Sequence, residues 1–122
     1  MRLLLVDKSA YVRGLDSFEP DDELCLCAIT RLELLYSARS AEDYAQLEQD
    51  LTEFRDLRMD AETFAIARTA QRELADRGQH RVSLPDLLIA ACAQQHAAGV
   101  LHVDRHFDVL TQVLEFEALR AS

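Results

Sequence analysis

Short apolar runs alternate along this chain with longer segments in which apolar residues recur every three or four positions. The runs read RLLLV, LCLCAI, VLHV and VLEFEAL, and polar or turn-forming residues bound each of them. Apolar runs of this length are typical of buried strands. We therefore expect four strands, at residues 2–6, 24–29, 100–103 and 113–119.

Helical periodicity is clearest in the middle of the chain. Apolar residues recur there at spacings of three and four, and the second series ends at Gly78, a suitable helix C-cap. We expect these two segments to form an antiparallel helix pair at about 41–76. The apolar positions that define the pair are Tyr44, Leu47, Leu51 and Phe54, followed by Phe64, Ala67, Ala70 and Leu74. Further helices are expected at residues 9–15, 31–38, 86–98 and 105–110.

Strands that alternate with helices predict an α/β fold with a central parallel sheet flanked by helices. The 122 residues, 49% of them hydrophobic, fit a single domain spanning residues 1–122. No apolar run approaches the roughly 20 residues that a membrane span requires, and an acid at position 7 interrupts the opening run. We therefore expect a cytoplasmic protein, in which Cys25, Cys27 and Cys92 are reduced core residues.

Acidic residues dominate the charge, since the formal net charge is −9 and the single lysine is Lys8. Proteins that bind nucleic acid usually present a basic surface, so this balance argues against a nucleic-acid partner. The more basic stretch at 68–81 makes the distribution uneven. A strongly acidic protein is also suited to a basic protein partner.

Four carboxylates occupy positions where an apolar run gives way to a helix start. They end the segments LLLVD, TRLE, SLPD and LHVD, and are Asp7, Glu33, Asp86 and Asp104. Ligands of open parallel α/β sheets bind beyond the carboxyl ends of the strands, so we expect these side chains to converge. Four acids in one crevice repel each other unless cations join them. The pattern therefore indicates a Mg²⁺ or Mn²⁺ site and phosphate chemistry.

Each acid also has a simpler interpretation as a helix cap. Thr30-x-x-Glu33 and Ser83-x-x-Asp86 match the capping-box pattern, and Asp104 is placed to cap the helix that follows it. Asp7 lies where a helix N-terminus favours negative charge. Capping explains the residues one at a time, but it does not explain why all four occur at crevice positions.

The chain resembles PIN-domain proteins, and more narrowly the VapC-type toxin ribonucleases of toxin–antitoxin pairs. The segments that carry the resemblance are LLLVDKSAYV, ITRLELLYSARS and LPDLLIAACAQQHAAGVLHVDRHFDVL. The resemblance implies a PIN fold and Mg²⁺-dependent cleavage of RNA to 5′-phosphate and 3′-hydroxyl ends. Its four catalytic and metal-binding acids correspond to Asp7, Glu33, Asp86 and Asp104.

Two positions depart from the family pattern. Lys8 stands where the family commonly has Thr or Ser, with the hydroxyl one residue later at Ser9. His106 stands where a further acid is frequent, so a second metal ion depends on whether Asp108 substitutes for it or only caps. The resemblance also implies a basic antitoxin that places an Arg beside the acids, and we expect a homodimer.

Other polar residues near the crevice have weaker signals. His102 and His106 alternate with Asp104, and we expect solvated or phosphate-contacting histidines there rather than metal ligands. Lys8, Ser9, Arg13 and Arg105 are either RNA phosphate contacts or ordinary surface residues.

Two other classes of protein compete with a nuclease. A phosphoacceptor receiver domain has a similar length and an acidic first strand, but it needs a late lysine, which this sequence lacks. A non-catalytic acidic interaction module, whose acids only cap helices, requires no metal and stays open as the alternative.

Overall fold

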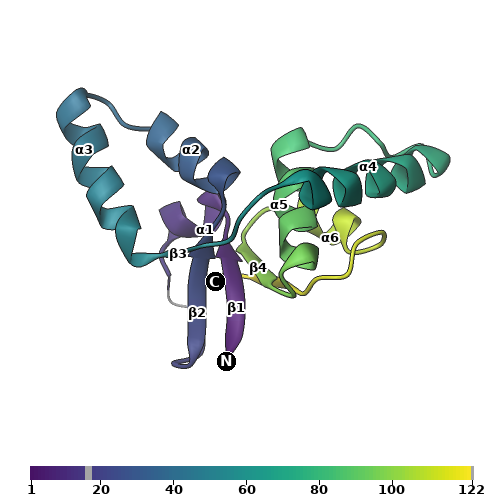
Figure 1. Ribbon diagram of the computed structural model, residues 1–122, viewed down its shortest axis with the longest axis horizontal. Coiled ribbons are helices and arrows are strands. Elements are labelled where there is room, and N and C mark those ends of the chain that lie inside the picture. The colour runs from purple at the N-terminus through teal and green to yellow at the C-terminus, as the bar shows by residue number, and fades with distance from the viewer. Residues whose placement is uncertain (16–17, 122) are drawn as a thin grey trace.

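A five-stranded sheet runs through the centre of the computed structural model, which describes residues 1–15 and 18–121 (Figure 1). The order across the sheet is β3-β2-β1-β4-β5, and every neighbouring pair is parallel. The predicted parallel sheet is therefore confirmed. The strands are β1 (Arg2–Val6), β2 (Asp22–Leu26), β3 (Arg55–Asp56), β4 (Gly99–His102) and β5 (Ala118–Arg120).

β1 is the central strand, and its sequence is apolar throughout after Arg2. Leu4, Leu5 and Val6 are fully buried, as expected where helices cover both faces of a parallel sheet. β1 pairs with β4, and the Asp7 N–H extends the pairing by donating to the Leu101 carbonyl at 3.0 Å. The carboxyl ends of β1 and β4 therefore lie side by side.

Helices cover the sheet in two groups. Consecutive strand residues face opposite sides, and accordingly Leu5 packs in a core with α4, α5 and α6, whereas Val6 packs in a second core with α1 and α2. Figure 1 shows α4, α5 and α6 gathered to the right and α2 and α3 to the left. The helices are α1 (Lys8–Arg13), α2 (Ala28–Tyr36), α3 (Ala41–Asp50), α4 (Ala61–Asp76), α5 (Leu84–Gln95) and α6 (His106–Leu110), with a 3₁₀ turn at Leu51–Glu53.

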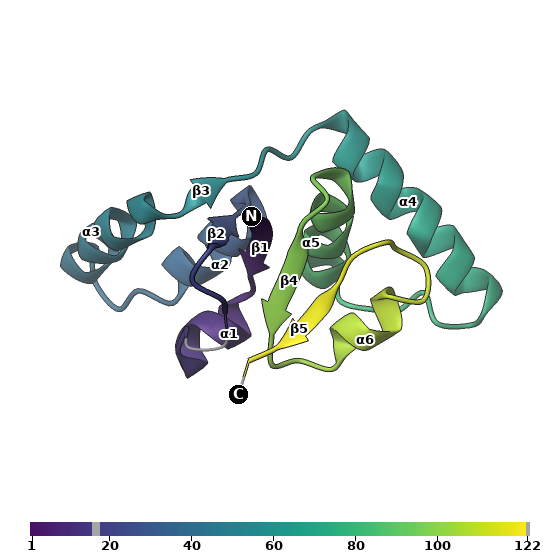
Figure 2. The same ribbon diagram turned by 90° about the horizontal axis from the view of Figure 1, so that it is seen from below.

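The predicted antiparallel helix pair at 41–76 is wrong, although both helices exist. α3 and α4 lie at opposite ends of the molecule, with the edge strand β3 between them (Figure 2). α4 packs on α5 through Ala67, Ala70 and Leu74. α3 has no buried residue; Leu51, counted in its apolar series, is buried in the 3₁₀ turn that follows it. Leu51, near the end of the first apolar series, thus packs in the core beside the sheet and does not pair α3 with α4.

The sequence predicted four strands and missed β3, and several predicted boundaries also move, among them the start of β2, which lies at Asp22 rather than Leu24. α2 begins at Ala28 rather than Arg31, because Cys27 is the N-cap and the Thr30 hydroxyl accepts a hydrogen bond from the Cys27 N–H at 2.8 Å. The last strand is confined to β5, since residues 113–117 lead from α6 back to the sheet and bury Leu114 in the core.

Two other predictions concern burial and membranes. Cys25, Cys27 and Cys92 are free and buried, as expected. Among the described residues, no helix combines the length and the hydropathy that crossing a membrane requires.

The turn between α5 and β4 places an alanine in a left-handed conformation. Ala97 has φ 54°, and the next N–H, that of Ala98, donates back to the Ala93 carbonyl at 2.8 Å. This position normally favours glycine. Gly99 is needed two residues later instead, where a Cβ would lie 3.0 Å from a methyl group of Leu4 and 3.1 Å from the Glu117 carbonyl.

We predict that Ala97→Gly stabilises the protein by about 0.5–1 kcal/mol, because glycine adopts positive φ without the steric cost of a Cβ. Urea unfolding followed by circular dichroism measures the change. Ala98→Gly is the matched control: it removes a buried methyl group at an adjacent position and should destabilise by about 1 kcal/mol. An equal loss of unfolding free energy in Ala97→Gly and Ala98→Gly would contradict the prediction.

Candidate metal centre

The four predicted acids line one cleft beside the carboxyl ends of β1 and β4. The cleft has a volume of about 510 Å³. Its walls are the start of α1, the middle of α2, the start of α5 and the turn before α6. The lining residues are Asp7, Lys8, Ser9, Val12, Glu33, Ser83, Asp86, Asp104 and His106. The convergence expected from the sequence is therefore present.

Asp7 combines capping with a place in the cleft. It is the N-cap of α1, and its Oδ2 accepts hydrogen bonds from the Ser9 N–H at 3.1 Å and the Ser9 hydroxyl at 2.5 Å. The Ser9 oxygen in turn accepts from the Val103 N–H at 3.1 Å. Ser9 thus ties the end of β1 to the segment after β4 and positions Asp7.

Asp86, like Asp7, is a buried acid of the site. It is the third residue of α5, where its N–H donates to the Ser83 hydroxyl at 3.4 Å. Its side chain is 12% exposed, and it makes no hydrogen bond within the described residues. Burial raises the pKa of Asp86 to about 6, and the charges of Asp7, Asp104 and Glu33 add to this effect. Ser83 alone supplies the cap, which leaves the Asp86 carboxylate free.

Glu33 does not open its helix, contrary to the expectation from Thr30-x-x-Glu33. Because α2 begins at Ala28, Glu33 is its sixth residue and projects into the cleft from the helix middle. Burial, followed by repulsion from Asp7, raises the pKa of the half-buried Glu33 carboxyl, while the charge of Lys8 opposes the shift. The capping interpretation of Glu33 is therefore wrong.

Asp104 lines the cleft and lies just before α6, whose N-cap is Arg105 rather than Asp104 as expected. Its Oδ1 accepts a hydrogen bond from the His106 N–H at 2.9 Å, which fixes the turn into α6. The same oxygen lies 3.4 Å from the His106 Nδ1. Asp104 thus combines a hydrogen bond to the first turn of α6 with membership of the acidic cluster.

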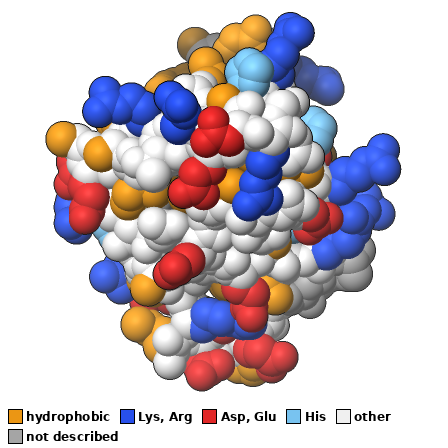
Figure 3. Space-filling model, turned by 90° about the vertical axis from the view of Figure 1, so that its right-hand side faces the viewer, with side chains coloured by type: hydrophobic (Ala, Val, Ile, Leu, Met, Phe, Trp, Pro, Cys, Tyr) orange, Lys and Arg blue, Asp and Glu red, His pale blue; other side chains and the backbone are white. Residues whose placement is uncertain are grey.

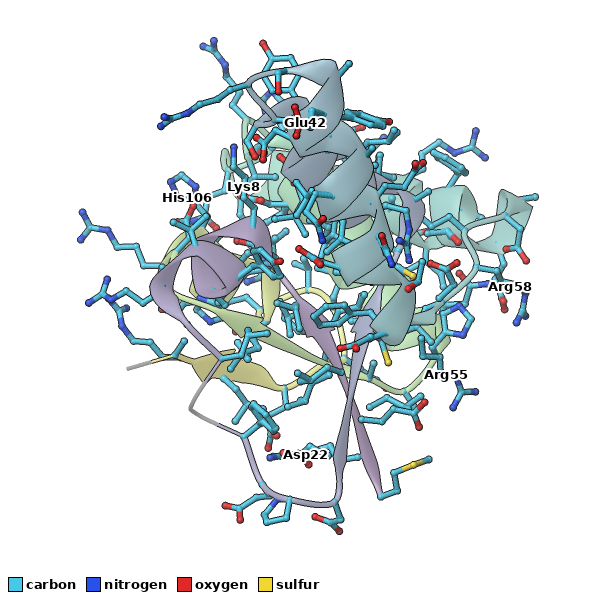
Figure 4. All side chains as sticks on the ribbon, turned by 90° about the vertical axis from the view of Figure 1, so that its left-hand side faces the viewer. Lys8, Asp22, Glu42, Arg55, Arg58 and His106 are labelled. Carbon is cyan, nitrogen blue, oxygen red and sulfur yellow. The ribbon has the colours of Figure 1, made fainter. Side chains whose placement is uncertain are left out.

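The two histidines expected to behave alike differ. His106 Nδ1 lies 3.7 Å from Asp86 Oδ2, and ligand atoms of Asp86, Asp104 and His106 all lie within 4.8 Å of one another. Figure 4 shows His106 and Lys8 at the same end of the molecule, opposite Asp22. The sequence signal for His106 was its place two residues after Asp104, where the family frequently has another acid.

His102 lies in the core rather than in solvent, so the expectation of a solvated or phosphate-contacting residue is wrong for it. It is 1% exposed, and its ring packs on Phe107 with centroids 5.1 Å apart. Burial lowers the pKa of its imidazole, which favours the neutral form. Asp108, on α6, is exposed and does not line the cleft.

The donor set fits a hard divalent cation. Asp7, Glu33, Asp86 and Asp104 share a cleft, yet within the described residues none of them forms an ion pair with lysine or arginine. Oxygen-rich sites of this kind bind Mg²⁺ or Mn²⁺, with water completing the coordination shell. A bound cation would offset the repulsion that raises the pKa of Asp86.

The model of the PIN domain family matches residues 5–112 of this chain. The chain belongs to the PIN-domain family. The matched segment of this PIN domain contains all four carboxylates and His106.

Characterised relatives place this PIN domain among the VapC proteins, as the sequence resemblance implied. Ribonuclease VapC17 of Mycobacterium tuberculosis is 44% identical over 114 residues, which cover 88% of this chain and 86% of that protein. Ribonuclease VapC51 of the same species is 40% identical over 108 residues, with coverage of 88% and 79%. The toxin–antitoxin structure VapBC-5, also from M. tuberculosis, matches with a TM-score of 0.79 and 26% identity, covering 99% of this chain and 100% of that chain.

We predict that ionised Asp86 destabilises the metal-free protein at neutral pH. The folded state keeps the proton up to about pH 6, whereas the unfolded chain releases it near 3.8, so ionisation costs the folded state about 2–3 kcal/mol above pH 6. In EDTA at neutral pH, the free energy of unfolding of Asp86→Asn should therefore exceed that of wild type by this amount. The difference should shrink as the pH falls through 6 and vanish near 4.

Urea unfolding at several pH values measures this difference. Asp108→Asn, which changes an exposed acid on α6, is the control and should stay close to wild type throughout. A stability difference for Asp86→Asn that does not vary with pH would contradict the prediction.

Proposed function

We propose that this protein is a divalent-cation-dependent endoribonuclease and the toxin of a toxin–antitoxin pair, acting in the cytoplasm. The observation that carries the proposal is the convergence of Asp7, Glu33, Asp86 and Asp104 in one cleft, with Asp86 nearly buried and unpaired with any described lysine or arginine. The ribonuclease relatives, similar over most of their length, support the same chemistry.

The carboxylates Asp7, Asp86 and Asp104, with Glu33 as a further candidate, would hold Mg²⁺ or Mn²⁺. When bound, such an ion lowers the pKa of a water ligand and neutralises charge on the phosphoryl oxygens during in-line attack. The residues themselves supply position, since Ser9 holds Asp7 in place and the start of α5 holds Asp86.

Glu33 is suited to orient the attacking water and to accept its proton. Its raised pKa makes this carboxyl a better proton acceptor than an ordinary glutamate, and its place in the middle of α2 fixes its direction into the cleft. Lys8, on the cleft wall, would contact the phosphate of the RNA. The products would be RNA ends bearing a 5′-phosphate and a 3′-hydroxyl.

The surface charge favours local rather than broad contact with RNA. The face formed around α4 and α6 shows acidic and basic side chains interspersed (Figure 3). With a net charge of −9, the protein gains little from long-range attraction to phosphates. Bound cations in the cleft would reverse the local charge, so RNA binding should itself depend on the metal.

We predict that Asp7→Asn and Asp104→Asn each reduce RNA cleavage at least about 100-fold, because the amide removes a charged ligand. Both variants should remain folded, since asparagine also serves as an N-cap. A fluorescent RNA cleavage assay with Mg²⁺ or Mn²⁺, repeated in EDTA, measures the rates. Asp108→Asn is the matched control and should cleave like wild type.

Normal rates in either cleft variant would refute the assignment of these residues. Wild type that binds its protein partner but cleaves no RNA in any of these conditions would favour the alternative, a non-catalytic interaction module.

We also propose a basic antitoxin partner that places an arginine beside the cleft acids, together with a homodimeric toxin. The net charge of −9 and the match to a VapBC toxin–antitoxin structure support the first part of this proposal. The homodimer stays a prediction.

Co-expression with the product of the adjacent reading frame should therefore yield a complex that cleaves no RNA and weakens as salt is raised. Size-exclusion chromatography at low and high salt, with a cleavage assay on each fraction, provides the measurement. An acidic neighbour, or one that leaves cleavage unchanged, would remove the support for this partner.

A further inference from the structure

His106 is the one histidine that the described residues bring into the acidic cluster. Its Nδ1 lies 3.4 Å from Asp104 Oδ1 and 3.7 Å from Asp86 Oδ2. The His106 N–H donates to the same Asp104 carboxylate at 2.9 Å, which holds the backbone of His106 beside that acid. From this position the imidazole reaches both carboxylates.

The spacing of the three donor atoms suits ligands of one ion. Cations with ligand distances near 2.1 Å hold neighbouring ligands about 3 Å apart in an octahedron. The distances from His106 Nδ1 to Asp104 Oδ1 and Asp86 Oδ2 exceed this value by less than 1 Å. Rotation of the side chains accommodates a shift of this size. The His106 ring is 62% exposed, which leaves room beside it for water ligands and for a phosphate oxygen.

An ion pair between His106 and the acids does not account for the site by itself. One imidazolium carries a single charge, whereas four carboxylates line the cleft. His106 lies outside the core, so its ring has no packing role comparable to that of His102 against Phe107. A divalent cation bound by His106 Nδ1 and several carboxylates would account for both the distances between these groups and the excess negative charge of the cleft.

We infer that His106 is a metal ligand and that it makes this site prefer Mn²⁺ to Mg²⁺. The inference rests on the proposed function, and it names the ion of that same site. Mg²⁺ takes oxygen ligands and loses its water reluctantly, whereas first-row transition ions accept imidazole readily. An acid at position 106 would give an all-oxygen site suited to Mg²⁺; histidine gives a mixed site of nitrogen and oxygen.

The experiment measures metal binding directly, without cleavage. Titration of the metal-free protein with Mn²⁺, followed by the electron paramagnetic resonance signal of the free ion, gives the Mn²⁺ affinity, and competition gives the Mg²⁺ affinity. Electron spin-echo modulation then reports whether ¹⁴N is bonded to Mn²⁺. The proteins compared are wild type, His106→Ala, His106→Asp, Asp86→Asn and His80→Ala, whose histidine is exposed and does not line the cleft.

Wild type and His80→Ala should bind Mn²⁺ at least about tenfold more tightly than Mg²⁺ and show ¹⁴N modulation. His106→Ala should lose the modulation and about tenfold in Mn²⁺ affinity, with a change below about threefold for Mg²⁺. His106→Asp should also lose the modulation, but it should bind Mg²⁺ more tightly than wild type does. Circular dichroism confirms that each variant is folded.

Two results would overturn the inference. Absence of ¹⁴N modulation in wild type, or its persistence in His106→Ala, shows that the bound nitrogen is not that of His106. An unchanged ratio of Mn²⁺ to Mg²⁺ affinity in His106→Ala contradicts the preference. If Asp86→Asn alone loses Mn²⁺, the inference fails and the proposed metal site stands; if wild type binds neither ion, both fail.

Discussion

Repulsion among carboxylates at one edge of the sheet is the interaction on which the rest of the site depends. Asp86 is nearly buried, and the charges of Asp7, Asp104 and Glu33 add to its desolvation. A fold stabilises such an arrangement only when neighbouring structure compensates for it. Here the compensation is local, since Asp7 and Asp104 each accept backbone hydrogen bonds at a helix start. Asp7 and Asp104 are therefore held in place by the protein itself, without a bound cation.

The central strand organises this edge. β1 pairs with β2 on one side and β4 on the other, so Asp7 follows the strand that contacts most of the sheet. Ser9 extends the link to Val103, which follows β4, through hydrogen bonds to both Asp7 and the Val103 N–H. The apolar sequence LLLV thus has two roles, filling both cores and fixing the direction of the first acid.

The sequence predicted the parallel sheet and the cleft acids because both depend on local signals. Short apolar runs end at charged residues, and the carboxyl ends of parallel strands meet at one edge. The pairing of α3 with α4 was wrong because periodicity shows which face of a helix is apolar but not what covers it. The start of α2 was missed because its N-cap is Cys27, which is not one of the preferred N-cap residues. The sequence did not distinguish His102 from His106, because both lie two residues from Asp104. In the structure His102 packs against Phe107 in the core, whereas His106 lies beside Asp104 in the cleft.

The short edge strands have a consequence for assembly. β3 has two exposed, charged residues, Arg55 and Asp56, and β5 at the other edge has three residues. Strands this brief offer an incoming strand too few unpaired backbone groups for a stable extension of the sheet. Addition of a strand to either edge of the sheet is therefore disfavoured. Stable association of this protein with another chain would therefore depend on side chains of the helix surfaces. Such side chains differ between proteins, whereas the backbone groups of a sheet edge are common to every chain.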